Sequence, residues 1–115
     1  MQSFKLDVDK SPRSTDSVSI YQLKGKLSLE TVSEFLPKLR ADSSSHVIAD
    51  MTGVNFLDSA GVGALVSLFV SRRNHGKSFV LCGLGPQATA VVTVAGLQNL
   101  LPIFKTIEDA LAKKP

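Results

Sequence analysis

Asp58 and Ser59 are followed by small residues in the segment Asp-Ser-Ala-Gly-Val-Gly, which spans positions 58–63 and precedes an apolar helical pattern. Asp and Ser are both good N-cap residues, so a helix should begin at Asp58 or Ser59. A hydroxyl beside a carboxylate could act as a nucleophile or contact another protein. On physical grounds alone, a helix cap worth about 1 kcal/mol is the simpler interpretation.

A catalytic role for Ser59 would require a histidine as base and an acid to orient it. His75 ends the helix that Ser59 begins, about 24 Å away at 1.5 Å per residue. His46 opens a strand, and parallel strands place it at the opposite end of the sheet from Ser59. Leu57 stands where a nucleophile elbow needs glycine, and no phosphate-binding loop pattern occurs. We therefore expect no catalytic residue and no enzyme activity.

The composition excludes several classes of ligand. The 115 residues are 43% apolar and 20% charged, which suits one folded domain spanning positions 1–115. The net charge is +3, but the basic residues form no dense stripe interleaved with aromatics, so direct nucleic-acid binding is not expected. No metal-ligand spacing, signal peptide or membrane-length apolar stretch is found. We expect a cytoplasmic protein without cofactor, metal or membrane insertion, in which Cys82 is buried.

Two strands and a helix are expected in the first part of the chain. Residues 4–8 and the segment from Val18 to Gly25 should form an antiparallel hairpin. Ser28 suits the N-cap of a helix over residues 29–40, although Pro37 falls inside it. Residues 47–51 form an apolar run typical of a strand buried on both faces, and residues 52–55 should form the loop after it.

Helices and strands alternate in the second part. The patterns predict a helix from about 59 to 73, a strand over 78–84 and a helix from Pro86 to before Gly96. They also predict a weak edge strand over 101–104 and a last helix over 107–113 capped by Thr106. The resulting order, β-β-α-β-α-β-α-β-α, predicts an α/β fold. Its mixed sheet of four to five strands should be parallel in its later part and packed against about four helices.

The sequence resembles the STAS family, the domain of bacterial anti-sigma factor antagonists, over nearly its whole length. The residues that carry the resemblance are Gly25–Ser28, Asp50–Val54 and Phe56–Gly61. The last stretch is similar to the family's Asp-Ser-Ser/Thr/Ala-Gly phosphorylation motif. The resemblance implies a STAS-like fold and a protein that binds an anti-sigma factor, which is also a serine kinase. That kinase would phosphorylate Ser59 and release the antagonist, and a PP2C-type phosphatase would reset it.

The chain departs from the family before the first helix. The family often has Gly-Glu-Leu/Ile-Asp there, whereas this chain has Gly25, Lys26, Leu27 and Ser28. Both acids are missing, and Lys26 reverses one charge near the motif. Some STAS domains are not phosphorylated and serve as binding subunits of lipid-transport ABC systems or signalling assemblies. This alternative function stays open.

The predicted partner surface centres on the Ser59 turn. Gly61 and Gly63 are expected to leave a shallow, exposed surface around the Ser59 hydroxyl. The residues expected to contact a partner are Lys26, Ser28, Thr52, Asp58, Ser59, Gly61, Val62, Gly63 and Val94. Among the hydroxyl groups, that of Ser59 is the expected phosphate acceptor, and the protein should be a monomer or a weak dimer.

Overall fold

A computed structural model describes residues 5–112 of the chain. Its elements are β1 (Leu6–Lys10), β2 (Val18–Leu27), α1 (Val32–Arg40), β3 (His46–Leu57), α2 (Ser59–Asn74), β4 (Ser78–Cys82), α3 (Pro86–Val94), β5 (Ile103–Phe104) and α4 (Ile107–Ala112). The predicted order and the α/β fold class are confirmed.

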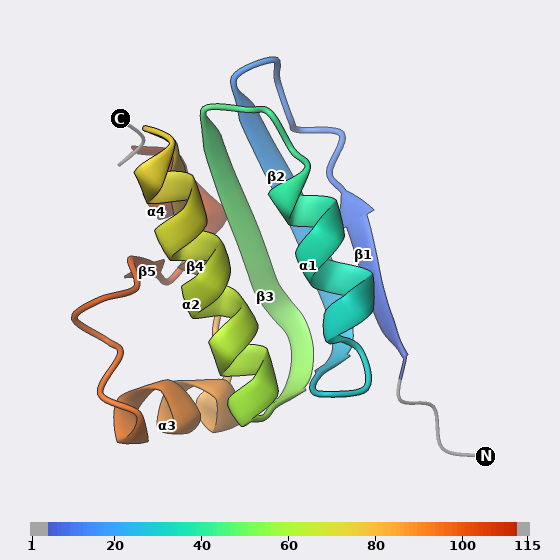
Figure 1. Ribbon diagram of the computed structural model, residues 1–115, viewed down its shortest axis with the longest axis vertical. Coiled ribbons are helices and arrows are strands. Elements are labelled where there is room, and N and C mark those ends of the chain that lie inside the picture. The colour runs from blue at the N-terminus through green and yellow to red at the C-terminus, as the bar shows by residue number, and fades with distance from the viewer. Residues whose placement is uncertain (1–4, 113–115) are drawn as a thin grey trace.

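The strands form one sheet in the order β1-β2-β3-β4-β5. β1 is antiparallel to β2, and the neighbours from β2 to β5 are parallel. The loops that follow parallel strands lie at the same edge of a sheet. The start of α1, the start of α2 and the whole of α3 therefore gather at one end of the molecule (Figure 1).

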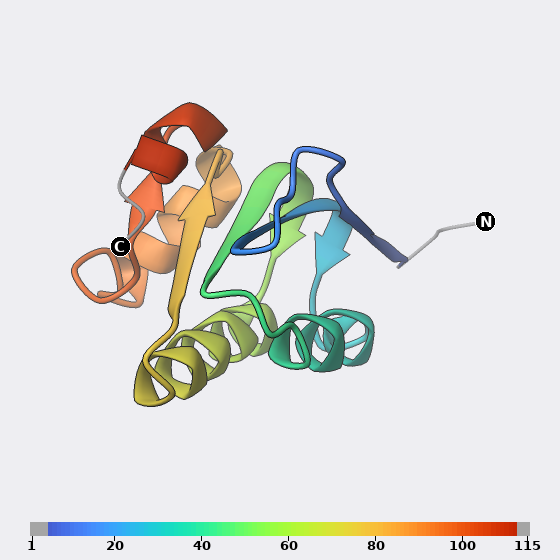
Figure 2. The same cartoon turned by 90° about the horizontal axis from the view of Figure 1, so that it is seen from above.

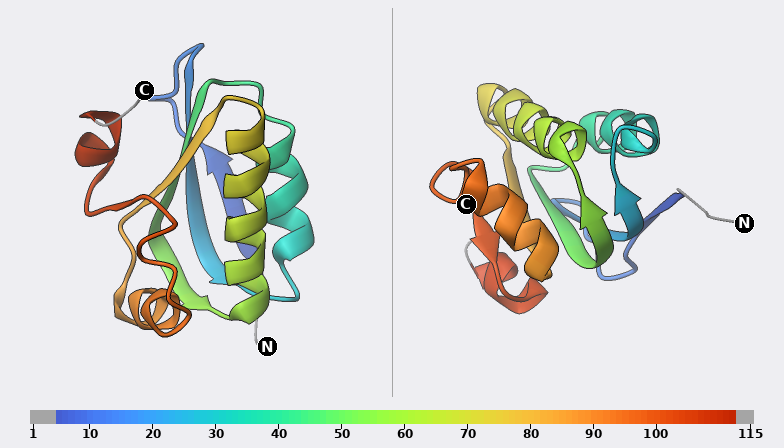
Figure 3. Two further views of the ribbon diagram at one scale, coloured as in Figure 1. Left: turned by 60° about the vertical axis from the view of Figure 1, so that its left-hand side comes forward. Right: turned by 90° about the horizontal axis from the view of Figure 1, so that it is seen from below.

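Helices cover both faces of the sheet. α1 and α2 lie side by side on one face, and α4 lies against the other (Figure 2). α3 lies crosswise to α2 at the end of the sheet (Figure 3). Its buried Ala88 and Val92 join the main core, whereas Ala110 of α4 packs over a smaller cluster that includes Ile20, Ile48 and Cys82.

β3 is longer than the sequence predicts. Residues 52–55 were expected to form a loop, but they continue the strand, which pairs with β2 as far as Leu27 and Leu57. The ladder contains register shifts between Gln22 and Lys24 and between Gly25 and Lys26. Such bulges let a strand continue through residues that look like a turn in the sequence.

The predicted cap of α1 is wrong. α1 begins at Val32, after Thr31, and not at residue 29. Ser28 is only 2% exposed, and its hydroxyl donates to the Glu30 carboxylate at 2.8 Å. Thr31 organises the turn instead, because its Oγ1 accepts from the Ser28 N–H at 3.0 Å and donates to the Lys26 carbonyl at 2.6 Å.

The C-terminal elements agree with the sequence patterns. β5 is a short edge strand that follows Pro102. α4 begins after Thr106, whose Oγ1 accepts from the Asp109 N–H at 3.1 Å, so the predicted cap is confirmed. The end expected for this helix, Lys113, lies outside the described residues.

Candidate functional site

Asp58 starts α2 and joins it to a neighbouring loop. It is the N-cap residue, and its Oδ1 accepts from the Gly61 N–H at 2.8 Å. Its Oδ2 accepts from the Leu29 N–H, in the loop between β2 and α1, at 3.1 Å. Ser59 follows as the first residue of α2 and is exposed. The predicted helix start is confirmed, with Asp58 as the cap and the Ser59 side chain exposed at the surface.

Gln87, in the first turn of α3, holds that helix against the same turn. Its Nε2 donates to the Leu57 carbonyl, and its Oε1 accepts from the Leu57 N–H, both at 2.8 Å. β4 ends at Cys82 and does not pair with the end of β3. The Gln87 side chain therefore makes the hydrogen bonds to Leu57 that a neighbouring strand would otherwise make. The sequence gives no signal for this contact beyond a polar residue in a first helical turn.

An apolar groove with a volume of about 420 Å³ lies between α2 and α3. The residues that line it are Ser59, Val62, Ala90, Val91, Val94 and Ala95. Ser59 supplies the polar group among them. Val94, a predicted contact residue, is 89% exposed at this groove.

Large apolar side chains are exposed around the same turn. Within residues 5–112, the four that are exposed are Leu29, Phe56, Val94 and Leu100. Leu29 is hydrogen-bonded to Asp58, Phe56 lies at the end of β3, and Val94 lines the groove. Exposed apolar patches commonly mark interaction sites. Leu29 and Phe56 are not among the contact residues predicted from the sequence, because their exposure depends on how the loops fold.

The predicted contact residues differ in exposure. Ser59, Thr52, Gly63 and Val94 are exposed, Lys26 and Asp58 are partly buried, and Ser28, Gly61 and Val62 are buried. The structure brings Ser59, Val62 and Val94 together in the groove. Thr52 instead lines a separate pocket of about 250 Å³, where its hydroxyl donates to the Asp50 carboxylate at 2.6 Å.

Gly61 does not expose a surface, and that expectation is wrong. A Cβ at this position would lie 2.4 Å from the Leu27 carbonyl oxygen. Glycine therefore lets α2 approach the end of β2 closely. Gly63, in contrast, is exposed, and a Cβ there would meet nothing within 4 Å.

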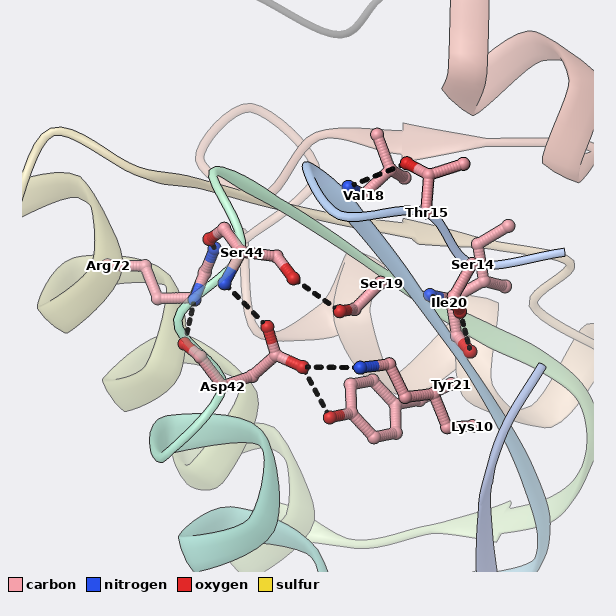
Figure 4. Close-up of polar contacts among 10 residues, drawn as sticks. All are labelled: Lys10, Ser14, Thr15, Val18, Ser19, Ile20, Tyr21, Asp42, Ser44 and Arg72. Carbon is pink, nitrogen blue, oxygen red and sulfur yellow. Dashed lines mark hydrogen bonds and ion pairs between the residues drawn. The ribbon is translucent and has the colours of Figure 1, made fainter. Parts of the chain in front are cut away.

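A polar cluster surrounds Asp42 (Figure 4). Asp42 lies between α1 and β3, at the end of the sheet opposite to Ser59. Asp42 Oδ2 accepts from the Tyr21 hydroxyl at 2.5 Å and lies 3.7 Å from Lys10 Nζ. Oδ1 accepts from the Ser44 N–H at 2.8 Å. Burial alone would raise the pKa of Asp42, but hydrogen bonds from Tyr21 and Ser44 hold that pKa well below its usual range. Burial and the bond to Asp42 raise the pKa of Tyr21.

Arg72 completes this cluster from α2. It is only 4% exposed. Its guanidinium donates to the carbonyl oxygens of Asp42, Ser44 and Ser78 at 3.1, 2.6 and 2.8 Å. The Asp42 carboxylate and the Arg72 guanidinium are thus occupied by bonds within the protein, which indicates a structural role.

The structure also bears on Cys82, on metal binding and on membrane-spanning helices. Burial raises the pKa of the Cys82 thiol to about 12, so this residue is a protonated part of the core, as expected. Within residues 5–112, no group of His, Cys, Asp or Glu side chains is arranged to hold a metal ion. In the same range, no helix is long and apolar enough to cross a membrane.

Comparison with known proteins connects this architecture to a family. The model of the STAS domain family matches residues 9–110. The anti-sigma-B factor antagonist of Listeria monocytogenes is 27% identical over 109 residues, which cover 92% of this chain and 94% of the relative.

Solved structures share the fold. An anti-sigma factor antagonist from Mycobacterium paratuberculosis superposes with a TM-score of 0.85 at 22% identity, covering 96% of this chain and 95% of the other. The anti-sigma factor antagonist SpoIIAA in its unphosphorylated form gives a TM-score of 0.77 at 19% identity, with 93% and 95% covered. SpoIIAA has also been solved in the phosphorylated form, with a TM-score of 0.71 at 19% identity, covering 93% of this chain and 98% of the other.

Proposed function

Because the chain belongs to the STAS domain family, we propose that it is an anti-sigma factor antagonist whose binding is switched off by phosphorylation of Ser59. The observation that carries this proposal is the position of Ser59. Its side chain is exposed at the first turn of α2, next to the cap Asp58 and beside an apolar groove. The name of the Listeria relative supports the same activity.

The partner in this proposal is an anti-sigma factor that is also a serine kinase. It transfers the γ-phosphoryl group of ATP to Ser59 Oγ, with loss of the hydroxyl proton and release of ADP. A PP2C-type phosphatase hydrolyses the phosphoester with water, which restores the hydroxyl and releases inorganic phosphate. The phosphate adds about −1.5 to −2 charges at pH 7. A helix N-terminus stabilises negative charge, so the fold should survive while the partner interface is lost.

Ser59 suits this role better than the other hydroxyl groups considered. Ser28 is buried, and the Thr52 hydroxyl donates to Asp50. Ser67 lies two turns into α2, is partly buried and accepts a hydrogen bond from Arg40 at 2.9 Å. A kinase active site would reach Ser59 with the least displacement of the protein.

The proposed contact surface extends beyond Ser59. It comprises Lys26, Asp58, Ser59, Val62, Gly63 and Val94, together with the exposed Leu29 and Phe56. The protein would act in the cytoplasm as a monomer or weak dimer, and it would bind without catalysing a reaction itself.

The test is phosphorylation by the cognate anti-sigma kinase with labelled ATP. Wild type should incorporate label, Ser59→Ala should not, and Ser67→Ala should match wild type. Ser59→Ala should still bind the kinase, because a small neutral side chain leaves the surface intact. Undiminished labelling of Ser59→Ala would exclude Ser59 as the acceptor.

A second function is favoured by Lys26, which stands where many family members carry an acid. Lys26 is partly buried at the end of β2 and pairs with Phe56 in the sheet. In this alternative, the protein is an unphosphorylated binding subunit of a lipid-transport ABC system or a signalling assembly. Absence of label from wild type, with retained binding to an ATPase subunit, would establish it.

A further inference from the structure

A polar cavity lies at the end of the sheet opposite to Ser59, where the C-terminal ends of α1 and α2 lie side by side (Figure 1). Its volume is about 310 Å³, and the residues that line it are Arg40, Asp42, Ser71, Arg72, His75 and Lys77. We propose that this cavity binds a small anion through a phosphate group, either free phosphate or the phosphate ester of a small molecule. The surface proposed for the anti-sigma factor is at the other end of the molecule, so this inference does not depend on it.

Arg72 is a buried cation without an acidic partner. Its Nε, Nη1 and Nη2 each donate to one carbonyl oxygen, so Nη1 and Nη2 each keep a second N–H. None of the ion pairs within residues 5–112 involves this residue. Burial lowers the pKa of Arg72, because its charged form loses water. A guanidinium that is buried in this way and lines a cavity would be stabilised by a counter-ion in that cavity.

The cavity carries more positive than negative charge. Arg40, Arg72 and Lys77 are its cations, and Asp42 is the one acid in its lining. Lys10 Nζ lies 3.7 Å from the Asp42 carboxylate and offsets its charge. The C-terminal ends of α1 and α2 add about half a negative charge each, so an excess of about two positive charges remains.

A phosphate group matches this excess better than a single carboxylate does. A phosphate ester carries about −1.5 to −2 charges at pH 7 and has three strong acceptor oxygens. The cations come from three parts of the chain, with Arg40 at the end of α1, Arg72 in α2 and Lys77 just before β4. Guanidinium groups bind phosphate oxygens in pairs. A volume of about 310 Å³ is at the lower end of the range for ligand pockets, which favours a small molecule.

Isothermal titration calorimetry on the full chain tests the site with inorganic phosphate, ribose 5-phosphate and succinate as probes. Lys77→Gln should weaken the binding of ribose 5-phosphate at least about fivefold, since hydrogen bonds between charged groups are the stronger ones. Arg40→Gln should act in the same direction. Arg73→Gln is the matched control, because Arg73 is exposed, does not line the cavity and lies over the Phe69 ring. It removes the same charge but should change binding by less than about twofold, as exposed charges contribute little.

Each outcome of these titrations decides a different point. Equal binding by Lys77→Gln and Arg73→Gln would overturn this cavity as the site, and succinate that binds as tightly as ribose 5-phosphate would overturn the phosphate group. Tighter binding of ribose 5-phosphate than of inorganic phosphate would assign the site to an ester, whereas equal or weaker binding would assign it to free phosphate. Failure of wild type to bind either phosphate probe would refute the inference. Labelling of Ser59 is a separate measurement, so none of these results bears on the proposed function.

Discussion

Glycines two positions apart in the first turns of α2 have different reasons to be glycine. At Gly61, a side chain would collide with the Leu27 carbonyl oxygen and the Leu57 side chain. At Gly63, the space is open and the residue is exposed. Proximity in the sequence therefore says little about which of them faces solvent.

A pair of alanine substitutions tests this difference. Gly61→Ala should destabilise the fold by about 1–3 kcal/mol, the usual cost of overpacking. Gly63→Ala should be neutral or stabilise by up to about 1 kcal/mol, because alanine is the better helix former. Urea unfolding monitored by circular dichroism measures both. If Gly61→Ala is as stable as wild type, α2 can move away from β2 more easily than the packing indicates.

Local chemistry explains which site residues can be predicted from the sequence. Asp58 and Ser59 are recognisable because a capping carboxylate and hydroxyl precede an apolar helical pattern. Leu29 and Gln87 cannot be recognised in this way. The exposure of Leu29 and the hydrogen bonds of Gln87 depend on segments that are distant in the chain. Ser28 was mistaken for the cap because Ser and Thr are both capping types, and the sequence alone does not show which of Ser28 and Thr31 directly precedes the helix.

At the scale of elements, the strands and helices follow from periodicity, but their ends do not. The apolar run at 47–51 correctly predicts β3, whereas its extension to Leu57 depends on pairing with β2 through two register shifts. A single sequence carries no signal for a bulge that only a partner strand can create. The order of elements was predictable because each has its own apolar pattern.

The hydrogen bonds between Gln87 and Leu57, which hold α3 against the end of β3, can be tested by substitution. Gln87→Glu keeps the shape of the side chain but removes the amide donor to the Leu57 carbonyl. We expect a loss of about 1–2 kcal/mol in the free energy of unfolding, typical of a broken hydrogen bond that leaves an acceptor unsatisfied. Urea unfolding monitored by circular dichroism would measure this loss, while the Leu57 N–H keeps an acceptor because a carboxylate oxygen replaces Gln87 Oε1.

Gln98→Glu is the matched control, because Gln98 is exposed beyond the end of α3. It should change stability by less than about 0.5 kcal/mol, as surface substitutions usually do. Equal behaviour of the two variants would mean that the apolar contacts of Ala88 and Val92 alone position α3.

In the whole molecule, the two ends of the sheet differ in the side chains they carry. The end with Ser59 exposes apolar side chains and a groove. The other end contains Asp42 and Arg72, whose bonds join β2, α2 and the connection between α1 and β3. The phosphoryl group that we propose for Ser59 would therefore lie far from the polar cluster, and it would change the surface without unfolding the protein.

The polar cluster makes stability depend on pH in a defined direction. Because the pKa of Asp42 is lowered in the folded state, its carboxylate contributes stability that is complete above its unfolded-state pKa of about 3.9. That contribution is lost progressively as the pH falls below this value toward the folded-state pKa.

Asp42→Asn should cost about 2–3 kcal/mol at pH 7, since hydrogen bonds to a charged group are the stronger ones. The gap between variant and wild type should narrow between pH 4 and pH 2.5, as urea unfolding at each pH would measure. Asp9→Asn, at an exposed position of β1, should show no comparable gap, and a gap for Asp42→Asn that stays constant down to pH 2.5 would contradict the lowered pKa.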